Sequence, residues 1–224
     1  MPRTARIVAI GYPHHITQRG NFCQPVFKDD KDKEQYLLWI QEYSDKYKLS
    51  ILTHCLMPNH VHFIGIPERE DSLARTFNTA HMRYAQYVNK KEKRNGHLWQ
   101  GRFFSCILDN PHLLMAARYI ERNPVRAKLV KKPWEWVWSS AQAHINGEEA
   151  LFSLSNLFDY VDMTPQEWKK YIDRAEERGY IDTIKQYTSV GRPLGTLEFV
   201  KKLEKELKER FPLLSRGRPR TENK

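Results

Sequence analysis

Short hydrophobic runs and longer helical stripes alternate along the first half of the chain. Two apolar runs, 51–56 and 61–66, flank the turn-forming residues Met57-Pro58-Asn59. This pattern predicts two strands joined by a tight connection. Further strands are predicted over 5–19, which contains an irregularity at its proline, and over 101–108.

Two amphipathic helices separate these strands. Asp29 or Asp30 is placed to cap a helix over 31–47, and a second helix is predicted to begin at Asp71 or Ser72. The expected buried face of the first helix is Tyr36, Ile40, Tyr43 and Tyr47, and that of the second is Leu73, Phe77, Ala80, Tyr84, Tyr87 and Val88. Both stripes have the spacing of a helix that packs one face on a core.

The resulting order, strand-helix-strand-strand-helix-strand, predicts an α+β fold. It is typical of a ferredoxin-like split βαβ sandwich, with one antiparallel sheet and both helices on one face. In this order the third strand is central, and the other face of the sheet is expected to be open to a ligand.

The rest of the chain is predicted to be helical. Asn110 caps a helix with Pro111 at its first position, and Pro124 ends it after Asn123. Thr164 opens a capping box for a helix to about 178, and Thr196 caps a last helix to about 210. We therefore predict three parts: a domain over 1–145, a helical basic extension over 146–210 that binds DNA, and a disordered basic tail over 211–224.

Composition narrows the class of protein. In 224 residues, Lys and Arg number 37 against 27 Asp and Glu, which gives a net charge of +10. This surplus favours a nucleic-acid partner. No apolar run approaches the length of a membrane span, and the N-terminal residues lack the pattern of a signal peptide. The three cysteines show no CxxC spacing. The expected location is cytoplasmic and nucleoid-associated.

His60-Val61-His62 opens the second strand of the predicted hairpin. Side chains alternate along a strand, so the two imidazoles share a face. Such a pair on rigid scaffold can form half of a divalent-metal site. The alternative is that both are polar residues on the solvated face of a half-buried strand.

Tyr119 and Asn123 lie four residues apart on one helix, so they share a face one turn apart. A phenol can attack phosphorus when a cation neutralises the phosphate, and two imidazoles with an amide oxygen make a three-ligand metal site. The alternatives are a core aromatic for Tyr119 and a simple helix end for Asn123.

These residues carry a family resemblance. His60-Val61-His62, preceded by Met57-Pro58-Asn59, resembles the histidine-hydrophobic-histidine motif of HUH single-strand endonucleases. The segment 119–127, YIERNPVRA, resembles the tyrosine helix of the single-tyrosine transposases and, closest, of their REP-associated relatives. The segments 98–103, LWQGRF, and 138–140, WSS, are similar to the same group. The likeness spans roughly residues 1–145.

The resemblance implies a site and a reaction. His60, His62 and Asn123 would hold Mg²⁺ or Mn²⁺, and Tyr119 would be the nucleophile. Single-stranded DNA would be cut by transesterification, leaving a 5′-phosphotyrosyl link and a free 3′-hydroxyl that allows rejoining.

Other residues compete for these roles. A free tyrosine is protonated at neutral pH, with a pKa near ~10, and its proton would go to water or to a third histidine, such as His14 or His15. Glu121 lies on another helix face and is a poorer ligand than Asn123. Tyr84 and Tyr87 are alternative nucleophiles by residue type, although their spacing assigns them to the inner face of a helix.

DNA-binding residues can also be proposed. Candidates for phosphate contacts and base stacking are Arg3, Arg6, Arg19, Arg102, Arg126, Trp99 and Phe103, with Trp99 alternatively in the core. Gly217-Arg218-Pro219-Arg220 resembles an AT-hook that would lay Arg218 and Arg220 in a minor groove, the alternative being a solvated tail.

The expected substrate is single-stranded DNA with a hairpin-bearing repeat, and the protein is expected to be a monomer or homodimer. Two other functions compete with this prediction. One is a non-catalytic, sequence-specific DNA-binding protein on the same fold. The other is a structural metal site in an interaction module, which the charge fits poorly.

Overall fold

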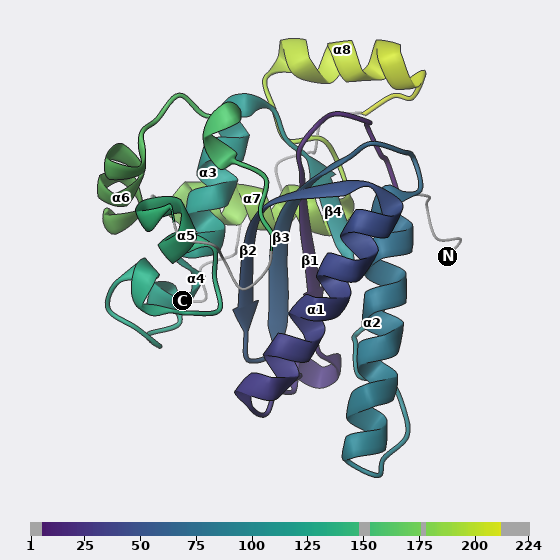
Figure 1. The fold of residues 1–224 in the computed structure, drawn as a ribbon. Coiled ribbons are helices and arrows are strands. Elements are labelled where there is room, and N and C mark those ends of the chain that lie inside the picture. The colour runs from purple at the N-terminus through teal and green to yellow at the C-terminus, as the bar shows by residue number, and fades with distance from the viewer. Residues whose placement is uncertain (1–5, 148–152, 176–177, 212–224) are drawn as a thin grey trace, which may run out of the picture.

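A four-stranded antiparallel sheet forms the centre of the computed structural model, which describes residues 6–147, 153–175 and 178–211 (Figure 1). The strands run in the order β2-β3-β1-β4. Their bounds are β1 His14–Arg19, β2 Leu49–Met57, β3 His60–Pro67 and β4 Phe104–Ile107. This order confirms the predicted ferredoxin-like arrangement, with β3 inside the sheet.

Helices α1 (Asp30–Tyr47) and α2 (Ser72–Lys91) cover one face of the sheet (Figure 1). Ile16 and Phe63 of the sheet pack there with Tyr36, Phe77 and Tyr84 of the helices, all fully buried. The predicted stripes of both helices are therefore confirmed as core, except that Tyr47 and Tyr87 are only partly buried against it. Asp29 is the N-cap of α1, because its side chain accepts a hydrogen bond from the Asp32 amide.

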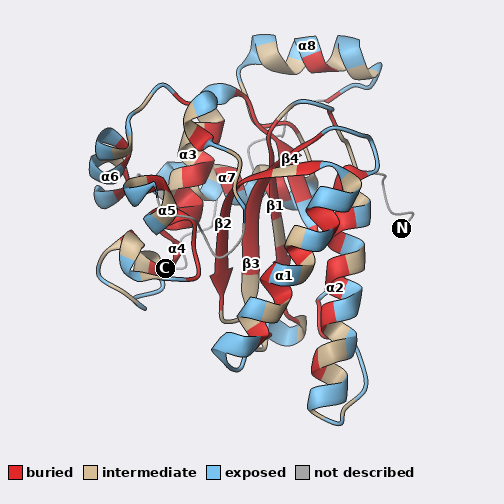
Figure 2. Cartoon of the chain, in the orientation of Figure 1, coloured by how far each residue is buried: buried red, intermediate tan, exposed pale blue. Residues whose placement is uncertain are grey.

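The opposite face of the sheet is also covered, so the prediction of an open face is wrong. It is covered by helices α3 (Asn110–Glu121), α5 (Ala141–Asn146), α6 (Pro165–Asp173) and α7 (Arg178–Val190). Leu52 and Ile64 from the sheet share one hydrophobic cluster with Ile120, Trp168 and Ile184 from these helices. Figure 2 shows the strands as almost continuously buried. Any ligand must reach this face at its edges.

The first and fourth strands are shorter than predicted. β1 begins only at His14, because Gly11 has a left-handed φ of 77° and Pro13 cannot donate to a neighbouring strand. The Gly11 amide instead donates to the carbonyl of Pro67. β4 likewise covers only Phe104–Ile107.

The tyrosine helix differs from the prediction at both ends. Asp109, and not Asn110, is the N-cap of α3, because its side chain accepts a hydrogen bond from the His112 amide. The helix ends at Glu121. Pro124 does not end it but lies in the first turn of a short helix, α4 (Asn123–Arg126).

The described part of the chain after residue 145 is mainly helical. Thr164 forms the predicted capping box of α6, although that helix ends at Asp173 rather than near residue 178. Thr196 caps α8 (Leu197–Leu207), as predicted. Three short 3-10 turns complete the elements: η1 (Asn21–Cys23), η2 (Pro133–Glu135) and η3 (Leu157–Asp159). None of the helices in the described ranges is long and apolar enough to cross a membrane. The proposed domain boundaries remain predictions.

Candidate active site

His60 and His62 lie on the same face of β3, the face that α3 and α7 cover. The β1–β3 register pairs Arg19 with His60 and Thr17 with His62. His62 is 5% exposed, whereas His60, at the end of the strand, is partly exposed. The alternative of two histidines on a fully solvated face therefore does not hold.

The fold brings Tyr119 to these histidines. The Tyr119 ring on α3 meets the His62 ring edge to face, with centroids 5.5 Å apart and planes at 88°. It meets the His15 ring, from β1, in the same way at 5.9 Å and 87°. The His60 and His62 centroids are 5.1 Å apart. A phenol and three imidazoles thus form one cluster from three elements.

A neighbouring side chain fixes the orientation of the His60 ring. His60 Nδ1 lies 2.6 Å from Asn59 Oδ1, while Asn59 Nδ2 donates to the Cys23 carbonyl at 3.0 Å. The second contact sets the amide so that its oxygen faces His60. His60 Nδ1 must therefore carry the proton, which leaves a lone pair on Nε2.

A chain of hydrogen bonds holds the His62 ring. His62 Nδ1 lies 2.9 Å from His15 Nε2, and His15 Nδ1 lies 2.8 Å from Thr188 Oγ1 on α7. The His62 Nε2 atom has no hydrogen-bond partner within the described part of the chain. His14, the other histidine considered, is on the opposite face, between the Ala9 amide and the Tyr12 carbonyl.

Burial keeps these imidazoles neutral. It lowers the pKa of His60 to about 4, with help from the charges of Arg19, Arg126 and Lys185. It lowers the pKa of His15 to about 3 and that of His62 well below its usual value. A neutral imidazole is the form that binds a metal, so both strand histidines are in the required state at neutral pH.

Asn123 is the residue predicted to complete the ligand set with its amide oxygen. It is 8% exposed, and its Nδ2 has no hydrogen-bond partner among the described residues. A buried orphaned amide is costly, and turning it by 180° would put an oxygen where the nitrogen now stands. A cation held by the two imidazoles and this oxygen would remove that cost.

No group of three or more His, Cys, Asp and Glu in the described ranges is arranged to hold a metal. A three-ligand protein site would therefore need an oxygen of another kind, and the Asn123 amide is the predicted source of it. Two neutral nitrogens and one oxygen, with open positions, suit Mg²⁺ only moderately and Mn²⁺ well. The donor set fits the divalent ion that the resemblance implies.

Glu121 is not available to a metal. Its Oε1 accepts from Ser140 Oγ at 2.7 Å and contacts His144 Nδ1 at 2.6 Å, and its Oε2 accepts from Trp168 Nε1 at 2.8 Å. The carboxyl group is fully buried. It joins α3 to α5 and α6, in agreement with its expected exclusion from the site.

Tyr84 and Tyr87 are on α2, on the far face of the sheet from His62. The Tyr84 hydroxyl donates to the Val26 carbonyl at 2.7 Å. The packing role predicted for these two tyrosines is the one they have.

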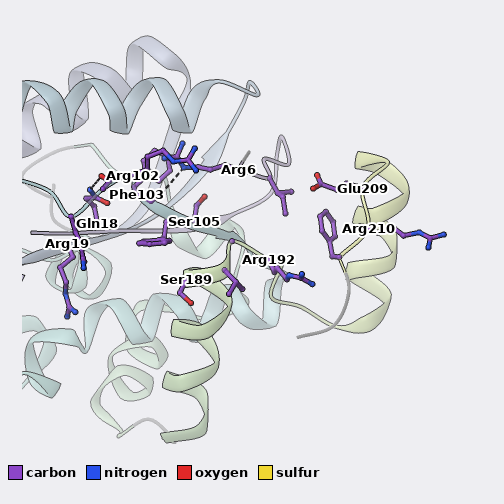
Figure 3. Close-up of a pocket in the computed structure, with 17 residues that line it drawn as sticks. Arg6, Gln18, Arg19, Arg102, Phe103, Ser105, Ser189, Arg192, Glu209 and Arg210 are labelled. Carbon is purple, nitrogen blue, oxygen red and sulfur yellow. Dashed lines mark hydrogen bonds between the residues drawn. The ribbon is translucent and has the colours of Figure 1, made fainter. Parts of the chain in front are cut away.

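A groove of about 790 Å³ lies along the β1–β4 edge of the sheet (Figure 3). Its basic lining residues come from distant parts of the chain: Arg6, Arg19, Arg102, Arg192 and Arg210. Arg6 stacks its guanidinium 3.6 Å from the centroid of the Phe103 ring, and its Nη2 is buried with no partner in the described structure. Arg19 lies between this groove and the cluster of His60, His62 and Tyr119, because it pairs with His60 in the sheet.

The aromatic residues proposed for base stacking are mostly buried. Trp99 is 8% exposed and donates its indole N–H to the His81 carbonyl, and Phe103 is 3% exposed under Arg6. This burial favours packing roles for both. Phe22 and Phe104, which the sequence analysis missed, are 92% and 48% exposed, and Phe104 lines the groove.

Phe22 has a left-handed φ of 51°. No sequence pattern around it predicts this conformation or the exposure of its ring. For Phe104, the signal available was alternation along the fourth strand. Arg3, Arg218 and Arg220 lie outside the described residues.

Comparison with known proteins identifies the family. The model of the family "Transposase IS200 like" matches residues 11–123, about half of the chain. The chain therefore belongs to the IS200-like transposase family. Transposases are enzymes that act on DNA, and the chain accordingly has a DNA-processing role.

One solved structure of a transposase shares the fold, and a second is similar to a lesser degree. A REP-associated tyrosine transposase bound to a REP hairpin is 18% identical, with a TM-score of 0.57 over 70% of this chain and 93% of that one. A putative transposase from Deinococcus radiodurans is 15% identical, with a TM-score of 0.38 over 54% of this chain and 97% of that one. No curated protein matches the sequence.

Proposed function

We propose that the protein is a metal-dependent endonuclease and strand transferase for single-stranded DNA, with Tyr119 as the nucleophile. The observation that carries this proposal is the edge-to-face contact of the Tyr119 ring with His62, at 5.5 Å between centroids. A core tyrosine has no need of two neutral strand histidines with unpaired Nε2 atoms. A nucleophile that attacks a metal-bound phosphate needs both.

The reaction exchanges one phosphodiester for another. The Tyr119 oxygen forms a bond to phosphorus as the bond from phosphorus to the 3′-oxygen breaks. The phenolic proton leaves through solvent, and the departing 3′-oxygen gains one, so the products are a 5′-phosphotyrosyl link and a 3′-hydroxyl. Because the new ester stores the energy of the old one, a 3′-hydroxyl can reverse the step and join strands.

His60 and His62, through Nε2, and Asn123, through its amide oxygen, would hold the metal. When bound, Mg²⁺ or Mn²⁺ would neutralise the phosphate and the leaving oxygen. Arg126 adds a fixed positive charge beside Tyr119, with its guanidinium carbon 4.2 Å from the ring centroid. Its role is to hold a phosphate oxygen next to the nucleophile.

The groove along the β1–β4 edge would carry the DNA strand to this site. Arg6, Arg19 and Arg102 would contact phosphates, and Phe104 offers an exposed ring on which a base can stack. The unpartnered Arg6 Nη2 supports this role, since a phosphate oxygen would satisfy it. The Phe22 ring, on the turn that follows Arg19, is a second stacking surface.

A hairpin-bearing repeat is the proposed substrate. The solved relative with a REP hairpin shares this fold at a TM-score of 0.57, and the net charge of +10 suits a polyanion. The helical extension over 146–210 and the AT-hook-like arginines of the tail would grip flanking DNA.

Covalent trapping tests the proposal. The protein is incubated with hairpin oligonucleotides labelled at their 3′ end, the end that would stay joined to the protein, and Mn²⁺, and it is then run on a denaturing gel. A labelled protein band is expected that disappears with EDTA and in Tyr119→Phe, while the matched variant Tyr160→Phe, at an exposed tyrosine on another surface, keeps it. A band that survives in Tyr119→Phe would refute the assignment.

A second function, sequence-specific DNA binding without cleavage, is favoured by the burial of the site. Tyr119 is only 5% exposed. It lines a cavity of about 240 Å³ together with Ile181 and Ile184 of α7. Hairpin binding that is unaffected by EDTA, with no covalent product from any oligonucleotide, would establish this function instead.

A further inference from the structure

We propose that Thr188, through His15, fixes the His62 tautomer that leaves Nε2 as the metal-binding atom. This inference rests on the proposed function only in assigning a metal to His62. The hydrogen-bond chain itself is a property of the protein without metal. Thr188 is thus a positioning residue supplied by α7, outside the segment that the family model matches.

The chain is shielded from water along its whole length. His15 is 1% exposed, Thr188 is 2% exposed and His62 is 5% exposed. The planes of the His15 and His62 rings are nearly parallel, at 7°, and the two facing ring nitrogens are 2.9 Å apart, within hydrogen-bond distance. No solvent can substitute for a lost partner here, so each proton position is decided by the neighbouring protein atoms.

Two polarities of the chain are possible with neutral rings, and they are mutually exclusive. In one, His62 Nδ1–H donates to His15 Nε2, and His15 Nδ1–H donates to the Thr188 hydroxyl oxygen. In the other, the Thr188 hydroxyl donates to His15 Nδ1, and His15 Nε2–H donates to His62 Nδ1. Only the first leaves a lone pair on His62 Nε2.

Thr188 can support the first polarity because its hydroxyl has a second outlet. Its Oγ1 lies 3.2 Å from Cys106 Sγ on β4. The Thr188 hydroxyl can therefore accept a hydrogen bond from His15 while it donates one to the sulfur. Burial raises the pKa of Cys106 to about 12, and the group remains a neutral thiol, a weak acceptor for that proton. In the first polarity, each donor from His62 to Thr188 therefore has an acceptor within hydrogen-bond distance.

Replacing Thr188 by valine removes the acceptor while keeping the shape of the side chain. In the first polarity, His15 Nδ1–H would then face a methyl group as an unpaired buried donor, which is unfavourable. His15 relieves this by moving its proton to Nε2, which donates to His62 Nδ1. His62 is thereby driven to the Nε2–H tautomer, which has no lone pair for the metal.

The experiment reads the tautomer directly in the metal-free protein, by long-range ¹H–¹⁵N correlation of the imidazole nitrogens at neutral pH. In the wild type, His62 is expected as the Nδ1–H tautomer. In Thr188→Val it is expected to shift to Nε2–H, and Thr188→Ser, which keeps the hydroxyl, is expected to restore the wild-type pattern. An unchanged His62 tautomer in Thr188→Val would overturn the proposal.

Mn²⁺ affinity is the second readout. Direct titration with Mn²⁺ alone is expected to show affinity on the order of tenfold weaker in Thr188→Val and near normal in Thr188→Ser. Equal affinity in wild type and Thr188→Val would refute the role. The urea midpoint of each variant shows whether a change reflects general destabilisation, because valine and serine would then both lower affinity in step with stability.

Failure of this inference can be told apart from failure of the proposed function. Wild-type protein that forms a Mn²⁺-dependent adduct, together with an unchanged Thr188→Val tautomer, would overturn the inference alone. Wild-type protein that neither binds Mn²⁺ nor forms an adduct would overturn the proposed function, whatever the tautomer shows.

Discussion

The Arg126 guanidinium carbon lies 4.2 Å from the centroid of the Tyr119 ring, and Arg126 Nη2 donates a 2.6 Å hydrogen bond to the Tyr119 carbonyl. The guanidinium is thus anchored to the helix turn that carries Tyr119, the proposed nucleophile, and its positive charge is close enough to stabilise negative charge that develops on the phenol oxygen. The positive charge also reaches His60 and His62, whose pKa values it helps to lower, after burial.

Arg126→Ala is expected to slow adduct formation by about a hundredfold at saturating Mn²⁺, because one fixed donor to the reacting phosphate is lost. Single-turnover rates on an end-labelled oligonucleotide measure this. Arg75→Ala, which removes an exposed arginine from α2, is the matched control and should react at the wild-type rate. Equal rates for the two variants would show that Arg126 only packs against the ring.

The groove arginines should control binding in a salt-dependent way. Arg19→Ala and Arg192→Ala are each expected to weaken single-strand binding and to reduce the slope of log K against log salt by about 0.7 per lost phosphate contact. Fluorescence anisotropy across a salt series gives these slopes. A parallel shift of affinity with an unchanged slope would place the DNA elsewhere.

The buried Glu121 carboxyl group should stabilise the fold rather than serve the reaction. Glu121→Ala leaves Ser140, His144 and Trp168 without their partner, and it is expected to lower the free energy of unfolding by about 3–5 kcal/mol. Urea denaturation is the measurement. Glu34→Ala, at an exposed position on α1, should stay within about 0.5 kcal/mol of the wild type. A small loss for Glu121→Ala would contradict this role.

Acid should destabilise the protein through its buried histidines. Burial lowers the pKa of His81 to about 3, while an unfolded histidine titrates near ~6.5. Between these values the unfolded chain binds the extra proton, so stability is full above ~6.5 and falls as the pH drops toward 3. The contribution per such group is about 1.4 kcal/mol for each pH unit.

Urea midpoints measured from pH 7 to pH 4 test this effect. The His81 ring accepts or donates a hydrogen bond with the Tyr36 hydroxyl at 2.9 Å, so His81→Gln can keep a polar partner there. Its midpoint should be lower at pH 7 but should depend less steeply on pH. His97→Gln, at an exposed histidine, should retain the wild-type slope. Identical slopes in all three proteins would rule out His81 as a source of acid lability.

Local signals were enough to predict much of the fold. The apolar stripe of α1, the caps at Asp29, Thr164 and Thr196, and the tight β2–β3 connection all depend on residues close in the sequence. They fix the strand-helix order, and that order fixes the position of β3 in the sheet. The placement of His60 and His62 on one face of β3 follows from alternation alone.

Packing between segments that are far apart in the sequence could not be predicted from local patterns. The face predicted to be open is covered in part because α7, far along the chain, packs on β1 and β4. No local sequence pattern indicates which strands a distant helix will contact. For the same reason His15 could be proposed only as one of two proton acceptors. Its bond to Thr188 spans a sequence separation of 173 residues.

The identity of the nucleophile is the central claim, and peptide mapping of the covalent adduct tests it most directly. Trypsin cleaves after Arg118 and after Arg122, so Tyr119 is released in the peptide YIER, while Tyr84 and Tyr87 share the peptide YAQYVNK. We predict that the 5′-phosphonucleotide mass appears on YIER and depends on Mn²⁺. An adduct on YAQYVNK or on any other tyrosine peptide, with YIER unmodified, would contradict the account.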